Sequence, residues 1–218
     1  MNRDEPREDP GTGARAGAQP STLVARDAGV RQLADPKSMR ALAHPTRLAL
    51  VEALVREGPL TATEAAKLLD DSPGNLSWHL GVLAKYGFIE EVVAKGRRRP
   101  WRLTAISASF SSASGDTPDL TAAREALDAL ATEQAVASRR EWQSRRHHFE
   151  EPWREAAYSS STITYLTPDE LDAVGAELSA VMHRYRDRAL DKAQRPPGSR
   201  PVRLTAWGHP LPPTPSGS

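Results

Sequence analysis

Basic side chains are concentrated in one short stretch of this chain. Residues 72–103 hold six basic residues against two acidic ones, Glu90 and Glu91. The six are Lys85, Lys95, Arg97, Arg98, Arg99 and Arg102. Over all 218 residues the charges nearly cancel, with 29 Lys and Arg against 28 Asp and Glu. A local excess of cations is the chemistry that binds the phosphates of a nucleic acid, and the near-neutral total excludes only a uniformly basic coat.

The segment before this cationic cluster is typical of a helix with one exposed polar face. Ser72-Pro73 supplies an N-cap and a proline at the first helical position. Leu76, Leu80 and Leu83 recur at helical spacing and predict a buried stripe. The opposite face is small, polar and free of acids, and it carries Gly74, Asn75, Ser77, Trp78, Gly81 and Lys85. Such a helix can enter the DNA major groove, ~12 Å wide, without bringing carboxylates against phosphates.

Other chemistries find little support in the sequence. The chain has no cysteine, which excludes disulfides, thiolate metal sites and cysteine nucleophiles. It has no Gly-x-Ser-x-Gly elbow, no phosphate-binding glycine loop and no His-Glu-x-x-His, so we predict that it is not an enzyme. His147 and His148 are adjacent and would point about 100° apart on a helix, which is poor geometry for one metal ion. We therefore expect no metal and no cofactor.

The elements around the polar helix follow a recognisable order. A short helix from Asp35 is interrupted at His44-Pro45, and a second helix runs from there to Gly58-Pro59. The expected core face of this second helix consists of Leu48, Val51, Leu54 and Val55. A third helix starts at a Thr61–Glu64 capping box, and its expected core face consists of Ala65, Leu68 and Leu69. Residues 88–94 and 99–103 read as two strands joined by a turn at 95–98. Three helices, the polar helix and a hairpin are the order of a winged helix-turn-helix, predicted over residues 33–104.

Two segments in this region resemble a known family. The chain is similar to the ArsR-type winged-helix transcriptional regulators in two segments, Ala41-Leu42-Ala43-His44-Pro45-Thr46-Arg47-Leu48 and, further along, Asn75-Leu76-Ser77-Trp78-His79-Leu80. The resemblance implies a cytoplasmic, homodimeric bacterial regulator that binds an operator and usually represses. It also implies that the polar helix is the recognition helix and that residues 95–99 form the wing. Metal-sensing members carry cysteines that this chain lacks, and Trp78 stands where smaller polar or basic side chains are common.

The rest of the chain predicts a second region that helps a dimer to form. A long helix is expected over about 118–151, with a narrow apolar seam suited to helix–helix association. Strands at 162–166 and 202–206 flank a helix that begins at a second capping box, Thr167–Glu170, which predicts a β-α-β unit. Two strands are not a stable sheet, so a second subunit is the simplest source of the others. This region weakly resembles extensions of some actinobacterial relatives.

The sequence therefore predicts an α+β, mainly helical protein: a winged helix-turn-helix, a long dimerisation helix and a small β-α-β unit. The predicted divisions are a disordered tail (1–32), the DNA-binding domain (33–104), a Ser-rich linker (105–117), a dimerisation region in which an effector would be sought (118–208) and a second tail (209–218). With no signal peptide and no apolar run of membrane length, we expect a cytoplasmic protein that does not contact membranes.

The predicted function is regulation of transcription by a homodimer, most simply a repressor, bound to a near-palindromic double-stranded operator through residues 72–86 and 94–99. The expected DNA contacts are Ser72, Gly74, Asn75, Ser77, Trp78, His79, Lys85, Lys95, Arg97, Arg98 and Arg99. Among them, His79 fits a structural hydrogen bond at the helix flank better than a base contact. The alternative is a protein-interaction module that uses the winged helix as its partner surface. The effector, if there is one, is left open.

Overall fold

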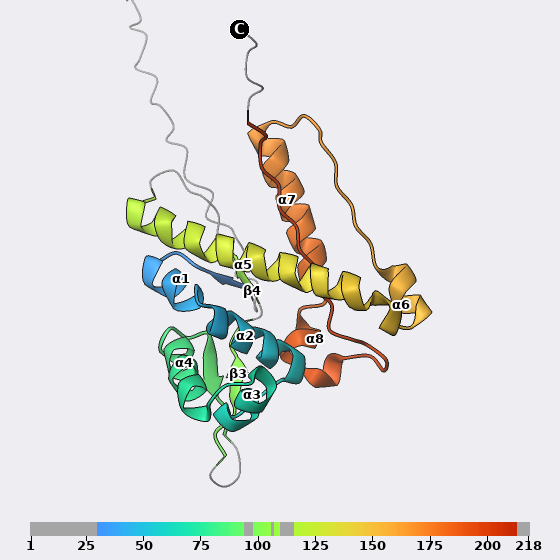
Figure 1. The fold of residues 1–218 in the computed structure, drawn as a ribbon. Helices are drawn as coiled ribbons and strands as arrows, with labels where there is room; N and C mark the ends of the chain where they lie inside the picture. The colour runs from blue at the N-terminus through green and yellow to red at the C-terminus, as the bar shows by residue number, and fades with distance from the viewer. Residues whose placement is uncertain (1–29, 94–97, 106, 110–115, 213–218) are drawn as a thin grey trace, which may run out of the picture.

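Four helices with well-formed starts make up the first part of the computed structural model, which describes residues 30–93, 98–105, 107–109 and 116–212 (Figure 1). They are α1 (Pro36–Leu42), α2 (Pro45–Glu57), α3 (Ala62–Leu69) and α4 (Pro73–Lys85). Asp35 accepts a hydrogen bond from the Ser38 amide at 2.8 Å, and Ser72 Oγ accepts from the Asn75 amide at 3.2 Å. The predicted breaks at Pro45 and Pro73 are confirmed, because each proline takes a position whose N–H has no helical partner.

The core lies between these helices. The largest fully buried side chains are Met39, Leu50, Leu76, Leu80 and Leu83, which confirms the leucine stripe predicted for α4. Two of the other predicted faces need correction. In α3 it is Ala65 and Ala66 that are buried, whereas Leu68 is 51% exposed. In α2 the buried residues are Leu50, Ala53 and Leu54, and Leu48, Val51 and Val55 are only partly buried. Periodicity gives the spacing of a buried face, but neighbouring elements decide its rotation.

The predicted hairpin is present after α4. Strand β2 (Ile89–Glu91) pairs antiparallel with β3 (Trp101–Leu103), with Ile89 opposite Leu103. Leu60 also exchanges backbone hydrogen bonds with Trp101, at 2.8 and 3.0 Å, so the loop before α3 extends this sheet. Most of the predicted turn, residues 94–97, lies outside the described residues. Four helices and this hairpin are the architecture of a winged helix.

A second small sheet does not follow from the sequence. Strand β1 (Val30–Gln32) pairs in parallel with β4 (Ser107–Ser109), with Val30 opposite Ser107. The sequence assigns these residues to the end of the N-terminal tail and to the linker, and both assignments are wrong there. A three-residue parallel pair joins backbone segments far apart in sequence, and neither strand carries a local signal of its own. The other residues of the tail, 1–29, lie outside the described part of the chain.

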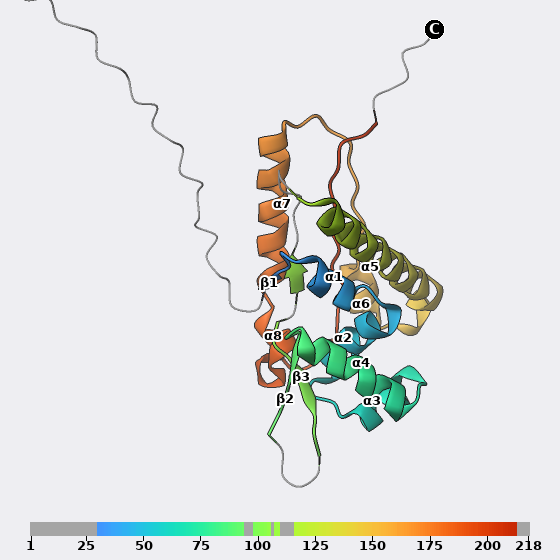
Figure 2. The ribbon, with the colours of Figure 1, turned by 90° about the vertical axis from the view of Figure 1, so that its left-hand side faces the viewer.

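Helix α5 (Pro118–Arg145) crosses the winged helix and packs against α1 (Figure 2). Its buried contacts are Ala123 and Leu127, and Gln134 Nε2 donates to Glu52 of α2 at 3.0 Å. The predicted helix to residue 151 is instead three pieces, α5, the 3-10 turn η1 (Arg146–His148) and α6 (Glu151–Ala156). The break has a covalent cause, since Pro152 has no N–H and its ring would clash within a continuous helix.

The C-terminal region contains α7 (Pro168–His183), α8 (Asp187–Leu190) and the 3-10 turn η2 (Lys192–Gln194). In both ribbon views α7 points away from the wing (Figures 1 and 2). The predicted β-α-β unit is wrong for this chain: residues 162–166 and 202–206 form neither strands nor helices. Both segments are exposed, and no strand among the described residues pairs with either of them, so alternation alone does not make a sheet.

Two arginines join this region to the winged helix: Arg203 pairs with Glu52 of α2 at 2.5 Å, and Arg195 makes a larger set of contacts. Arg195 donates through its guanidinium to the carbonyl oxygens of Val55 and Arg56, at 2.9 and 3.1 Å, in the last turn of α2. The same guanidinium donates to the carbonyl oxygens of Arg188 and Ala189 in α8, at 2.7 and 3.4 Å. Arg195 therefore satisfies carbonyl groups at the ends of two helices at once.

Candidate nucleic-acid interface

The outward face of α4 has the composition expected of a surface that another molecule approaches closely. Its predicted residues are all exposed, and Trp78 is 61% exposed. A Cβ added at Gly74 or Gly81 would meet no atom within 4 Å, so nothing inside the protein requires glycine at either position. Glycine within a helix costs roughly 0.5–1 kcal/mol relative to alanine. The two glycines instead leave the helix surface open to a partner from outside.

Two polar side chains at the start of α4 already make hydrogen bonds within the protein. Ser72 Oγ caps the helix, and Asn75 Nδ2 donates to the Asp71 carboxylate at 2.8 Å. Both remain exposed, so Asn75 can exchange this partner for an external one. Ser77 and Trp78 are exposed one turn further along. These are the α4 side chains best placed to touch a molecule lying on this face.

His79 does not lie on this face. It is only 3% exposed, its ring centroid lies 4.6 Å from that of His44, and the indole of Trp78 packs edge-on against it. Burial lowers the pKa of His79, and the nearby charges of His44 and Arg47 lower it further. The structure thus places His79 inside the domain and away from the exposed face of α4 on which the other predicted DNA contacts of this helix lie. Its Nδ1 is buried without a hydrogen-bond partner.

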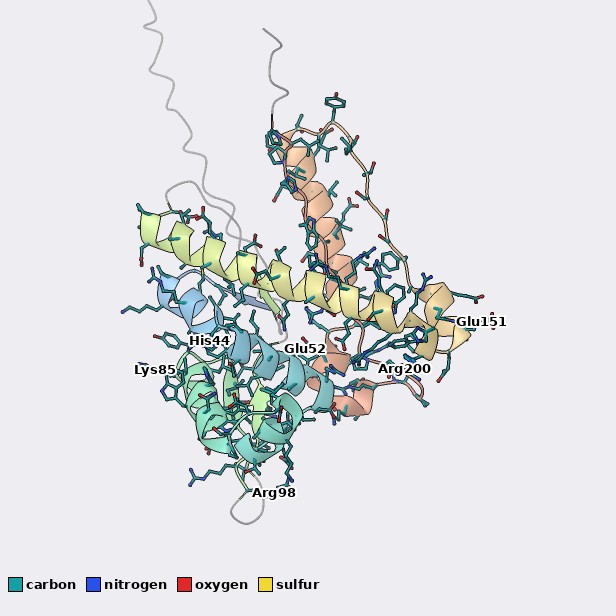
Figure 3. The ribbon with its side chains drawn as sticks, viewed as in Figure 1. His44, Glu52, Lys85, Arg98, Glu151 and Arg200 are labelled. Carbon is teal, nitrogen blue, oxygen red and sulfur yellow. The ribbon has the colours of Figure 1, made fainter. Side chains whose placement is uncertain are left out.

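The wing arginines are held by carboxylates. Arg98, labelled in Figure 3, pairs with Glu64 of α3. Arg102 pairs with Glu90 across the hairpin at 2.7 Å, and Arg99 lies 3.7 Å from Glu91. Lys95 and Arg97 lie outside the described residues. The sequence count of charges missed these pairs because Glu64 is 34 residues from Arg98 and the Glu90–Arg102 pair depends on strand register. The exposed arginines can still turn to an external anion, since surface ion pairs are weak.

Glu64 has two roles in this arrangement. Its carboxylate accepts from the Thr61 amide at 2.9 Å and from the Thr61 hydroxyl at 2.8 Å, which completes the capping box of α3. These hydrogen bonds lower the pKa of Glu64, and the charge of Arg98 lowers it further. The same carboxylate therefore caps α3 and pairs with an arginine of the wing.

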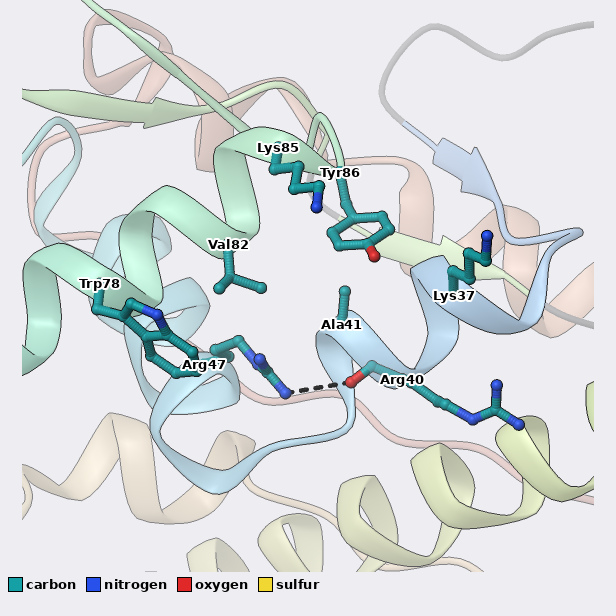
Figure 4. Close-up of a pocket in the computed structure, with 8 residues that line it drawn as sticks. All are labelled: Lys37, Arg40, Ala41, Arg47, Trp78, Val82, Lys85 and Tyr86. Atoms are coloured by element: carbon teal, nitrogen blue, oxygen red, sulfur yellow. Dashed lines mark hydrogen bonds between the residues drawn. The ribbon is translucent and has the colours of Figure 1, made fainter.

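Sequence analysis missed a cationic groove beside α4. The groove has a volume of about 320 Å³ and lies between α1, the start of α2 and the second half of α4 (Figure 4). Its lining residues are Lys37, Arg40, Ala41, Arg47, Trp78, Val82, Lys85 and Tyr86. Only Trp78 and Lys85 are predicted as interface residues from the sequence. The four cations come from three helices, so no single stretch of sequence signals them.

The described residues contain no group of three or more His, Cys, Asp or Glu side chains that could hold a metal ion. The rings of His147 and His148 lie 4.0 Å apart on the exposed turn η1. Within the part of the chain that the structure describes, no helix is both long and apolar enough to cross a membrane.

Comparison with known protein families decides what the first part of the chain is. Residues 42–92, from the end of α1 through β2, match the model of a helix-turn-helix domain. This segment is a helix-turn-helix domain. The match spans helices α2, α3 and α4, with α4 as the last of the three, and the wing strand β3 and helix α5 lie beyond it. A search of curated proteins finds no match to the sequence. A helix-turn-helix domain of this type binds DNA, so the polar face of α4 belongs to a DNA-binding domain of the winged-helix type.

Proposed function

We propose that this protein is an ArsR-type, homodimeric transcriptional repressor that reads a near-palindromic operator. The observation that carries this proposal is the outward face of α4, which is exposed, contains no acidic residue within the helix and is opened by Gly74 and Gly81. Ser77 and Trp78 would contact base edges in the major groove. The wing residues Lys95, Arg97, Arg98 and Arg99 would contact phosphates, which position the domain without reading sequence.

The distribution of buried residues supports the dimer. Among the described residues, none after Leu127 is buried, although the second half of the chain carries many large apolar side chains. A second copy of the chain would cover apolar surface that one copy leaves in water. Two recognition helices would then meet successive major grooves ~34 Å apart on the operator. An inducer would act by binding more tightly to a dimer whose helices no longer match this spacing.

Fluorescence anisotropy on the DNA upstream of the protein's own gene tests the proposal, with a scrambled duplex measured beside it. We expect tighter binding to the native fragment at both ~50 and ~200 mM salt, since base contacts survive salt that weakens phosphate contacts. Equal, weak binding to both duplexes, abolished at the higher salt, would contradict the proposal and favour a protein-interaction module instead.

Two tryptophans give a matched pair of variants for this experiment. Trp78 and Trp207 are 61% and 62% exposed, one on α4 and the other near the C-terminus. Trp78→Ala should weaken binding to the native fragment about tenfold, because a base contact contributes ~1–3 kcal/mol of discrimination. Trp207→Ala should leave the affinity unchanged. Equal effects of the two substitutions would remove α4 from the interface.

A further inference from the structure

The groove beside α4 gathers positive charge without enough negative charge to balance it. Arg40 is paired with Asp119 of α5. Lys37, Arg47 and Lys85 have no carboxylate partner among the described residues, and Lys85 Nζ lies 5.8 Å from the Tyr86 ring. Three cations from α1, α2 and α4 thus share one open hollow, as Figure 4 shows.

Of the three cations, Arg47 gives the strongest indication that the groove binds an anion. Its guanidinium is half-buried and donates to the Arg40 carbonyl oxygen at 3.1 Å, while its Nε is buried without a hydrogen-bond partner. Burial lowers the pKa of Arg47, since the charged form loses solvation and no neighbouring carboxylate restores it. A partly desolvated cation without a counterion is costly, and an anion from outside the chain removes that cost.

The shape and place of the groove indicate which anion this is. The hollow is open to solvent, whereas sites for small molecules enclose most of their ligand. It continues directly from the face of α4 through Trp78 and Lys85. In Figures 1 and 3, α1 and Lys85 lie at one end of the domain and the wing with Arg98 at the other. A polymer that crosses α4 therefore passes both the wing and the groove.

We infer that Lys37, Arg47 and Lys85 bind a backbone phosphate of DNA at the edge of the major groove opposite the wing. The inference rests on the proposed function and extends it, because it adds a second phosphate clamp that the wing does not supply. The major groove is bordered by phosphates on both strands, so a recognition helix held at both edges is fixed in depth and tilt. The groove adds affinity for any sequence and leaves discrimination to Ser77 and Trp78.

A double variant, Lys37→Gln with Lys85→Gln, tests the inference. Both side chains are exposed, so the fold should tolerate their replacement, and Arg47 is left intact because it also bonds to the end of α1. The matched control is Arg154→Gln with Arg184→Gln, which removes two exposed charges from α6 and the end of α7. Affinity for the native and scrambled duplexes is measured by anisotropy from ~50 to ~200 mM salt, the range over which phosphate contacts weaken steeply.

We expect the groove variant to bind both duplexes more weakly by the same factor. Its slope of log K against log salt should be shallower by about 0.9 for each phosphate that the variant no longer neutralises. The control variant should keep the wild-type slope. An unchanged slope in the groove variant overturns the inference even if the wild-type protein prefers its native fragment.

The same titrations separate the inference from the proposed function. Equal wild-type affinities for the two duplexes overturn the proposed function, while the difference in slope still judges the groove. An absence of DNA binding even at ~50 mM salt, where phosphate contacts are strong, overturns both.

A duplex with methylphosphonate linkages locates the contact. Neutralising the phosphate that the groove holds should weaken the wild-type protein more than the groove variant, because that variant keeps only Arg47 of the three cations that contact it. If no single linkage distinguishes the two proteins, the groove does not hold a phosphate of the DNA.

Discussion

Helices α3 and α7 begin with the same capping motif, but only α3 packs into a core. In α3 the Glu64 amide donates to Thr61 Oγ1 at 3.2 Å, and in α7 the Glu170 amide donates to Thr167 Oγ1 at 3.3 Å. Each glutamate carboxylate in turn accepts a hydrogen bond from its threonine amide. Yet α3 buries Ala65 and Ala66, whereas α7 buries no residue. Capping specifies where a helix starts, and only its neighbours decide whether it has a core.

The same contrast separates two regions of the chain. Every residue described as buried lies between Leu33 and Leu127. Along α7 three apolar side chains remain exposed, Val174, Leu178 and Val181, and Leu178 is 45% exposed. The first region is stabilised by its own core, and the second has secondary structure whose apolar face is not covered within one chain.

The largest expected difference between the regions comes from one pair of leucines. Leu80→Ala should lower the free energy of unfolding by about 2–5 kcal/mol, because it leaves a cavity in the core. Leu178→Ala should change it by less than about 0.5 kcal/mol in a monomer, since exposed positions tolerate truncation. Urea denaturation at low protein concentration measures both. A large destabilisation by Leu178→Ala that appears only at high protein concentration would mean that a second copy covers α7.

A fall in pH should lower the stability of the first region, because it contains two histidines that are buried or partly buried. Burial lowers the pKa of both His44 and His79 below the value in the unfolded chain, about 6.5. Their contribution to stability is therefore complete above about pH 6.5 and decreases as the pH falls from there toward the folded-state pKa, by at most about 1.4 kcal/mol per pH unit for each histidine. Urea denaturation between about pH 7.5 and about pH 5, which spans the usual range of histidine titration, measures this slope.

A substitution at the start of α2 sharpens the pH prediction. His44 Nδ1 accepts from the Thr46 amide at 3.2 Å, so neutral His44 caps the helix. His44→Asn keeps a good N-cap and removes one titrating group, and the decrease of stability in acid should become shallower. An unchanged slope would mean that protonation of His44 is not linked to unfolding.

The smallest expected effects come from the two caps. Thr61→Ala should lower the free energy of global unfolding by about 1 kcal/mol. Thr167→Ala should cost α7 a similar local amount but leave global unfolding unchanged, because α7 adds no buried residue to the core. Hydrogen exchange separates the outcomes: amides in α7 should lose protection while those in α4 keep it. Equal effects of both substitutions on the urea midpoint would show that the two regions unfold as one.

Local signals in the sequence predict most of the first region. The prolines at 45 and 73, the Thr61 capping box and the leucines of α4 act within a few residues, so their positions can be read directly. The pairing of β1 with β4 cannot be predicted in this way, because it joins segments that carry no strand signals of their own. The alternation of apolar and polar residues at 162–166 wrongly predicts a strand, because a side-chain pattern does not show whether a neighbouring strand is present to complete a sheet.

The candidate site can be predicted only where it lies on one helix. Ser77 and Trp78 follow from the period of α4, but the burial of His79 depends on His44, 35 residues earlier. The ion pair of Arg98 with Glu64 and the groove around Arg47 likewise bring together residues from separate elements. Contacts of this kind are set by packing, which one sequence read along its length does not contain.

The contacts made by Arg195 and by the Arg203–Glu52 ion pair join the two regions of the chain. The Arg195 guanidinium serves two carbonyl oxygens in α2 and two in α8, at a junction without buried apolar side chains from the C-terminal region among the described residues. Water can take over each of these hydrogen bonds when the regions separate. The C-terminal region is thus held to the helix-turn-helix domain by polar contacts, those of Arg195 and the Arg203–Glu52 ion pair, so its separation would leave the buried core of the first region intact.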